Sequence, residues 1–209
     1  MFIPKLLILY GDVLDRERRQ LFKLKDLGPY PDFEVIKVQV NKLKELWAKI
    51  NDQDQIIKKI IDLTGVNLSR DMEAWIIGSG LSPMSHPFIV PISAKNKEIF
   101  SEETFVEIII HEIIHKFVGD QEETPRLEKY WNYLKNDKYK DESSSTRNHV
   151  ILYAVLKVII VEFFGRDKLS RYVRMENLPE DYKKAWDLME LEGAENLIAE
   201  FVKFTNEKI

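Results

Sequence analysis

One five-residue pattern limits what this chain can fold into more than any other feature. His111-Glu112-Ile113-Ile114-His115 places two histidines four residues apart, within a segment, 105–118, whose other members are almost all apolar. Such a segment indicates a helix that is buried on most sides. A buried polar group without a partner costs roughly 1–3 kcal/mol, and a lone carboxylate costs more. The fold must therefore supply a partner for both histidines and for the glutamate.

A metal ion satisfies all of these groups at once. Residues i and i+4 lie one helical turn apart, so the rings of His111 and His115 project from one face toward a common point. Glu112 lies about 100° round the helix from His111, where its carboxylate can take a proton from water beside the ion. We therefore predict one zinc ion held by both histidines, with Glu112 as the general base. The alternative is a pair of core histidines bonded to backbone carbonyls, with Glu112 reaching solvent or pairing with Lys116.

The amino-acid composition limits which catalytic groups, metal ligands and partners this protein can have. The 209 residues include no cysteine, which excludes thiolate nucleophiles, cysteine-based zinc sites and deaminases with paired cysteines. Any metal site must therefore use histidine or carboxylate ligands. The balance of 31 Lys+Arg against 35 Asp+Glu gives a net charge of −4, which argues against nucleic acid as the main partner. Abundant Lys, Glu and Ile resemble the composition of hyperthermophile proteins.

A catalytic zinc site needs a third protein ligand, and His149 is the candidate. It begins an apolar helical face and should therefore point inward from the first turn of its helix. The residues that continue this face are Leu152, Tyr153, Leu156, Ile160 and Phe163. The alternative for His149 is a histidine that caps a helix end. The alternative third ligands are Asp120, Asp141 and Glu142.

Three further residues are candidates for supporting roles. Glu107 lies one turn before His111 and can accept the second ring N–H of a ligand histidine, although a solvated surface glutamate is the alternative. Tyr153 or Tyr172 can donate a hydrogen bond to the oxyanion of a tetrahedral intermediate. Aromatic core packing is the commoner use of such a tyrosine.

The spacing of apolar residues predicts short strands followed by helices. Strands are expected over 5–10, 34–40, 73–77 and 86–93, and Ile36, Val38 and Val40 are expected to share one strand face. Pro87 and Pro91 indicate that the last of these strands is an edge or bulged strand, which can accept a peptide. Helices are expected over 41–50, 53–63, 102–118, 127–134 and 145–164, followed by about three C-terminal helices, one of which starts at Pro179 and ends near Gly193.

The apolar stretches of the chain do not indicate membrane insertion. Lys5 interrupts the apolar N-terminus and a charged run, 15–19, follows it, so a buried strand explains this stretch better than a signal peptide. The apolar segment 149–164 carries Lys157 and Glu162 and falls short of the roughly 20 apolar residues that a membrane span requires. We expect a cytoplasmic protein that has no membrane partner.

The His111–His115 pattern, with a small sheet before it and a ligand helix after it, resembles the zincin metallopeptidases over about residues 70 to 165. Val118 and Gln121 stand where the metzincin group has a glycine and its third histidine, so that extension is absent. The arrangement is more similar to gluzincins, whose third ligand comes from a second, downstream helix. That ligand is normally a glutamate, whereas the candidate here is His149.

The resemblance implies an α+β, zincin-like fold and a zinc-dependent metallopeptidase, a hydrolase of peptide or protein substrates. We expect a single domain over 1–209, with sheet and packing helices in 1–100, metal-site helices in 101–165 and a helical cap in 166–209. The alternatives are an inactive or latent module that binds peptides or regulates, and a zinc hydrolase of a non-peptide amide. The presence of Glu112 favours an enzyme, because a structural zinc site has no use for a base.

The connection between the two metal-site helices, 120–142, is long and polar. It begins close to the predicted metal and can therefore act as a plug. We expect that trimming or loosening residues 122–140, with both ligand helices intact, raises hydrolysis more than it alters stability, because the entropy of loop closure depends only weakly on loop length.

Overall fold

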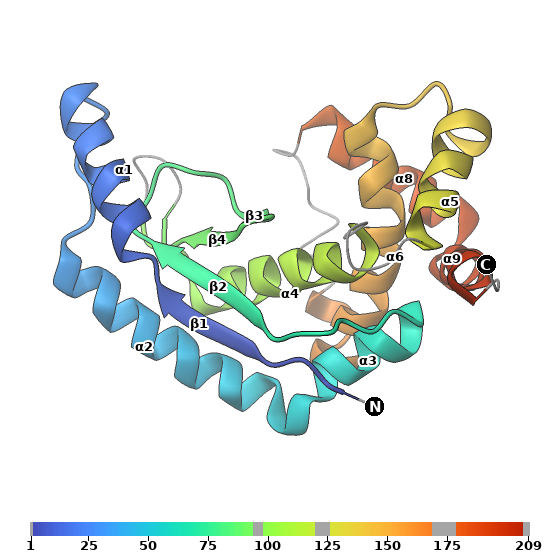
Figure 1. Ribbon diagram of the computed structural model, residues 1–209, viewed down its shortest axis with the longest axis horizontal. Coiled ribbons are helices and arrows are strands. Elements are labelled where there is room, and N and C mark those ends of the chain that lie inside the picture. Colours follow the sequence, from blue (N-terminus) through green and yellow to red (C-terminus); the bar gives the residue numbers. More distant parts are fainter. Residues whose placement is uncertain (1, 94–97, 120–125, 169–178, 207–209) are drawn as a thin grey trace. The chain divides into compact units, whose positions relative to one another are not determined.

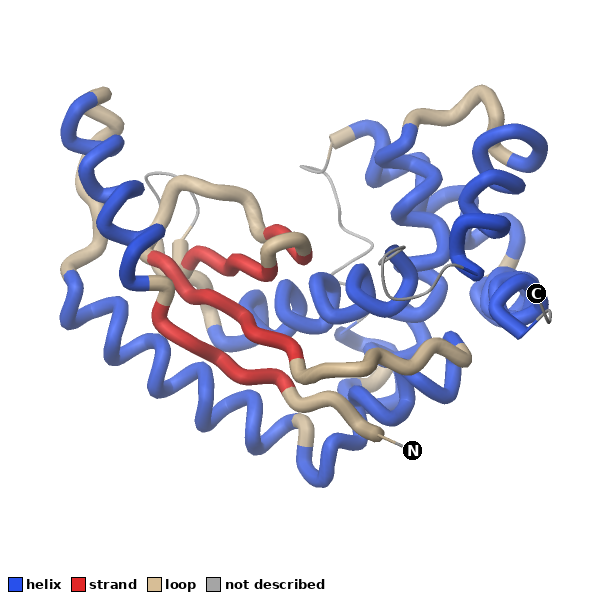
Figure 2. Tube along the Cα trace, viewed as in Figure 1, coloured by secondary structure: helices blue, strands red, loops and turns tan. Residues whose placement is uncertain are grey.

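The computed structural model describes residues 2–93, 98–119, 126–168 and 179–206, which combine many helices with one small sheet (Figure 2). Contacts divide the chain into two compact units. Unit 1 comprises Met1–Ile3, Gln55–Ser69 and Ile114–Ile209, and unit 2 comprises Pro4–Asp54 and Arg70–Ile113. The division falls inside one continuous helix, α4 (Glu102–Gly119). The expectation of a single domain stays a prediction.

Unit 2 contains the sheet, whose strands lie in the order β1-β2-β4-β3. β1, β2 and β4 are parallel, and β3 runs antiparallel to β4 (Figure 1). The sheet is therefore mixed, and the predicted α+β class is confirmed. The strand bounds are β1 (Leu6–Tyr10), β2 (Met72–Ile77), β3 (Met84–Ser85) and β4 (Phe88–Pro91).

The prediction of an edge strand over 86–93 is wrong, because β4 lies inside the sheet between β2 and β3. The sheet tolerates Pro87 and Pro91 because they lie at the two ends of this strand. Pro87 precedes the first residue of the strand and Pro91 is its last residue, so neither removes a donor from the middle of the ladder. β3 pairs only with Phe88 and Ile89 of β4. The edge on this side of the sheet is thus a strand of two residues.

The prediction of a strand over 34–40 is also wrong. These residues begin α2 (Phe33–Ile50), a single helix that includes the predicted helix 41–50. Ile36 and Val40 are buried together with Leu43 and Trp47, at helical spacing, whereas Val38 is 50% exposed. The strand pattern was ambiguous, because two apolar residues four positions apart share a face in both a strand and a helix.

A buried carboxylate, that of Asp15, forms hydrogen bonds at one end of the sheet in unit 2. Asp15 lies on α1 (Asp12–Leu24) and is fully buried. It accepts hydrogen bonds from the hydroxyls of Tyr10 (2.8 Å) and Tyr30 (2.5 Å) and from the backbone N–H of Gly78 (2.7 Å). A Cβ atom on Gly78 would lie 2.6 Å from the Tyr30 ring, so only glycine fits there. Asp15 therefore joins α1 to the carboxyl ends of β1 and β2.

Unit 1 is helical, and α6 (Ser144–Phe164) packs against several of its helices. α8 (Glu180–Glu192), α9 (Ala194–Asn206) and α3 (Gln55–Thr64) all contact it (Figure 1). Gly65 and Gly165, both with positive φ, end α3 and α6. Two of the predicted C-terminal helices are α8 and α9. No described helix is both long and apolar enough to cross a membrane.

The connection between α4 and α6 contributes to the core of unit 1. α5 (Arg126–Tyr133) is followed by a short π-helix, η2 (Leu134–Lys138), and the side chains of Leu127, Tyr130 and Leu134 are fully buried. The ring of Tyr130 packs edge-on against Phe201 of α9 at 4.9 Å. The expectation that trimming 122–140 has little effect on stability is therefore wrong, because it would remove these side chains from the core and uncover partners such as Phe201.

We predict that Asp15→Ala lowers the free energy of unfolding by about 2–4 kcal/mol, because two hydroxyls and one N–H lose their acceptor in a buried setting. Chemical denaturation measures this. Asp12→Ala is the matched control on the same helix: its carboxylate pairs with Arg16 at the surface, so the loss should stay below about 1 kcal/mol. Equal losses in the two variants would contradict a structural role for the Asp15 network.

Candidate metal centre

Helix α4 begins where the sequence predicts. The Oγ of Ser101 accepts a hydrogen bond from the backbone N–H of Thr104 at 3.2 Å, and Glu102 and Glu103 follow in the first turn, where the helix dipole favours negative charge. The apolar side chains of α4 are buried on most sides of the helix, as expected. These buried side chains are Phe105, Val106, Ile109, Ile110, Ile113, Ile114, Phe117 and Val118.

The structure brings His111, His115 and His149 together. Each offers one ring nitrogen, and these three atoms all lie within 4.8 Å of one another. The rings of His115 and His149 meet edge to face, with centroids 5.0 Å apart. Three histidines predicted from the sequence as ligands are thus close enough to bind a metal ion.

The donor set fits a zinc ion. In a tetrahedral site with zinc–nitrogen bonds of about 2.0–2.1 Å, ligand nitrogens are about 3.4 Å apart. Donors within 4.8 Å of one another reach that separation through side-chain shifts of about 1 Å. Neutral imidazole is a good ligand for zinc. The chemistry and spacing of these residues therefore suit a single metal ion.

Hydrogen bonds in the first turn of α6 restrict the orientation of His149. Ser143 caps the helix by accepting from the backbone N–H of Thr146 at 3.0 Å. The Nδ1–H of His149 donates to the carbonyl oxygen of Ser145 at 2.8 Å, so in the neutral ring the lone pair lies on Nε2. Burial lowers the pKa of His149, against the opposing effects of the Ser145 carbonyl and of the Asp181 carboxylate. The ring is therefore neutral near pH 7, the state that binds metals.

Glu112 is 6% exposed, although it is an acidic residue. Burial raises its pKa to about 7, from a usual value of 4.5. A carboxyl group with this pKa exchanges a proton readily near neutral pH. Its place directly after His111 in α4 puts this group beside the histidine cluster.

The carboxylates considered as alternative third ligands are placed differently. Glu142 lies 2.6 Å from the Nζ of Lys184 in an ion pair, and Asp141 is exposed. Asp120 lies outside the described residues. In the part of the chain that the structure describes, the group of candidate ligands comprises the three histidines. The geometry therefore favours His149 over Glu142 and Asp141. The fourth histidine, His86, is exposed in the turn before β4.

Three residues were predicted from the sequence to support the metal site: Glu107, Tyr153 and Tyr172. Glu107 is half-buried on α4, and its contact with a ligand histidine stays a prediction. Tyr153 is 1% exposed, and its ring packs against Trp186 at 5.4 Å and lies 5.6 Å from the His149 ring. This burial favours core packing over substrate contact. Tyr172 lies outside the described residues.

Sequence reasoning missed two residues beside His149. Asp181 and Tyr182 come from the first turn of α8, and the Tyr182 ring lies 4.1 Å from the ring of His149, centroid to centroid. The only local signal was Pro179, which predicted a helix start. A proline at a helix start does not indicate which other helix the first turn of α8 contacts.

Comparison of the chain with protein-family models, with curated proteins and with solved structures finds no significant match.

We predict that the purified protein holds one zinc ion per chain and that His149→Ala weakens zinc binding by about 100-fold or more, because a direct ligand matters at least as much as its outer partners. Competition with a chromophoric chelator measures the affinity. Asp141→Asn is the control: Asp141 is exposed, so its substitution should leave zinc affinity unchanged. Unchanged zinc affinity in His149→Ala, with loss in Asp141→Asn, would exchange the two roles.

Proposed function

We propose that this protein is a zinc-dependent metallopeptidase with a zincin-like fold. The observation that carries the proposal is the cluster of three histidines, His111, His115 and His149, with a buried glutamate directly after the first of them. Catalytic zinc sites use three protein ligands, whereas structural sites usually close with four. A set of three ligands accompanied by a base fits the catalytic type.

The ion would supply one part of the chemistry: held by three imidazoles, zinc keeps a position for water and substrate, polarises a carbonyl oxygen and makes water acidic enough to attack near pH 7. The chain supplies the rest. Its two α4 histidines share one rigid helix, and the Ser145 carbonyl fixes the tautomer of His149. These constraints keep the ligands in place without ordering a loop.

Glu112 is the residue to which we assign proton transfer. As a carboxylate it accepts the proton of the attacking water, and as a carboxylic acid it returns a proton to the departing amine nitrogen. Both forms must be accessible in one catalytic cycle. Burial, which brings its pKa to about 7, makes both forms available near neutral pH.

The order of elements supports a zincin-like fold. A small mixed sheet comes first, then α4 with the His111–His115 pair, and then α6 with the third histidine. Zincins have this order, and the gluzincin group takes its third ligand from a later helix. A histidine in that place instead of the usual glutamate makes the set neutral, so the bound ion would keep more of its positive charge for polarising the substrate.

The rival functions differ from a peptidase in measurable ways. A binding or regulatory module would hold zinc without turnover, and a hydrolase of non-peptide amides would cleave small amides but not peptides. The buried Glu112 favours an enzyme over a module, because burying an ionisable group is costly and a module would have no use for it.

We predict that the protein cleaves unfolded casein, that a chelator abolishes cleavage and that added zinc restores it. Glu112→Gln should lower kcat by about 10²–10⁴-fold, because the amide cannot accept the proton. Mass spectrometry of new peptides measures cleavage, and elemental analysis should find the zinc of the variant intact.

Glu102→Gln is the matched control, since Glu102 is an exposed glutamate in the first turn of the same helix. It should cleave as the wild type does. A Glu112→Gln variant that is as fast as the wild type would show that the base is another group. A zinc-loaded wild type that cleaves neither peptides nor small amides would favour the binding module.

A further inference from the structure

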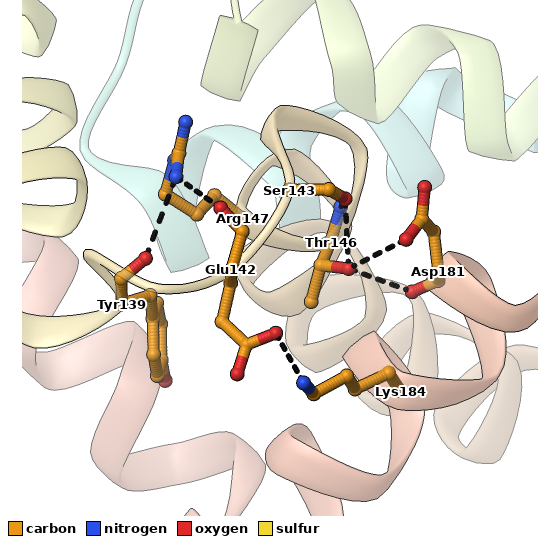
Figure 3. A network of polar contacts seen from close by, with 7 residues as sticks. All are labelled: Tyr139, Glu142, Ser143, Thr146, Arg147, Asp181 and Lys184. Carbon is orange, nitrogen blue, oxygen red and sulfur yellow. Dashed lines mark hydrogen bonds and ion pairs between the residues drawn. The ribbon is translucent and has the colours of Figure 1, made fainter.

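The first turn of α8 lies against the first turn of α6, the helix that carries His149. The hydroxyl of Thr146 donates toward two oxygens of Asp181, the backbone carbonyl oxygen (3.3 Å) and the side-chain Oδ1 (3.4 Å) (Figure 3). The Nζ of Lys184 lies 2.6 Å from the Glu142 carboxylate (Figure 3). Thr146 is fully buried. Three polar contacts thus fix the start of α6 against α8.

The same turn of α6 is also fixed from the side of the preceding chain. Ser143 caps it, and the guanidinium of Arg147 donates to the carbonyl oxygens of Tyr139 and Glu142 (Figure 3). The backbone that carries His149 therefore has little freedom. What remains variable is the orientation of the imidazole ring about its own side-chain torsions.

Tyr182 limits that remaining freedom. Its ring centroid lies 4.1 Å from that of His149, with the planes tilted by 56°. This contact is shorter than those of His149 with His115 (5.0 Å) and Tyr153 (5.6 Å). Rotation of the imidazole would break its bond to the Ser145 carbonyl and would drive the ring into Tyr182.

We propose that Tyr182 is a positioning residue of the metal centre: its ring packs on His149 and keeps Nε2 directed at the ion. The inference rests on the proposed zinc site. A ligand that is already oriented loses less conformational freedom on binding, so the ring of Tyr182 raises zinc affinity without contacting the ion. α8 thereby belongs to the centre although it provides no ligand.

The test compares Tyr182→Ala, Tyr182→Leu and Tyr182→Phe, using Zn²⁺ alone in competition with a chromophoric chelator. Loss of an outer partner typically costs 10–100-fold in metal affinity, and we expect losses of about that size for the alanine and leucine variants. The phenylalanine variant keeps the ring and should stay within about threefold of the wild type. Lys183→Ala, an exposed neighbour on the same turn, is the matched control and should match the wild type.

A spectroscopic measurement separates positioning from loss of stability. With Co²⁺ in place of zinc, the ligand-field bands report the geometry of the ligands. These bands should shift in the alanine and leucine variants and should match the wild type in the phenylalanine variant. If the alanine variant does not fold, the leucine variant, which fills more of the space of the ring, decides the question.

Three results would overturn the inference. Wild-type affinity and spectrum in Tyr182→Leu would show that the ring does not position His149, while the zinc site itself would stand. A Tyr182→Phe variant as weak as Tyr182→Leu would assign the effect to the hydroxyl instead of the ring. A wild-type protein that binds no zinc would overturn the proposed metal centre together with this inference.

Discussion

The rings of His115 and His149 meet edge to face at 5.0 Å, and this contact joins the helix with the sequence signature to the helix with the third histidine. His149 and the Glu112 carboxyl are buried, and His111 and His115 are half-buried. In such surroundings polar groups need partners. Three ring nitrogens within 4.8 Å of one another can share a metal ion, and burial raises the pKa of Glu112 to about 7.

Much of unit 1 serves to hold α6. Near the start of α8, Lys184 pairs with Glu142, which precedes α6. The Asp181 carbonyl oxygen accepts a hydrogen bond from Thr146 in the first turn of α6. At the end of α8, Glu192 lies 2.6 Å from the Nζ of Lys138 in η2. The same lysine lies 2.9 Å from Glu200 of α9. The side chain of Lys138 is largely buried, where such pairs are screened less than at the surface. α8 is thus fixed at both ends against the chain that precedes the ligand helix.

The sequence predicted the local features well, because they depend on a few residues. The apolar spacing predicted helices over 102–118 and 145–164, close to the bounds of α4 and α6. His149 could be found because it lies on an inward face. The strand expected over 34–40 failed because Ile36 and Val40 fit both periods, and only the continuation to Leu43 and Trp47 separates them. The placement of β4 inside the sheet, the core role of Tyr130 and the contact of Tyr182 with His149 depend on tertiary packing, which no short pattern in the chain encodes.

X-ray absorption at the zinc edge, recorded on protein purified without added metal, reports the ligands of the ion directly. We expect about one zinc per chain, with outer-shell scattering from three imidazole rings and nitrogen or oxygen ligands at about 2.0–2.1 Å. In His149→Ala the imidazole scattering should fall to that of two rings. A wild-type spectrum that already fits two imidazoles or fewer, or a protein that contains no zinc, would contradict the convergence of His111, His115 and His149 on one ion.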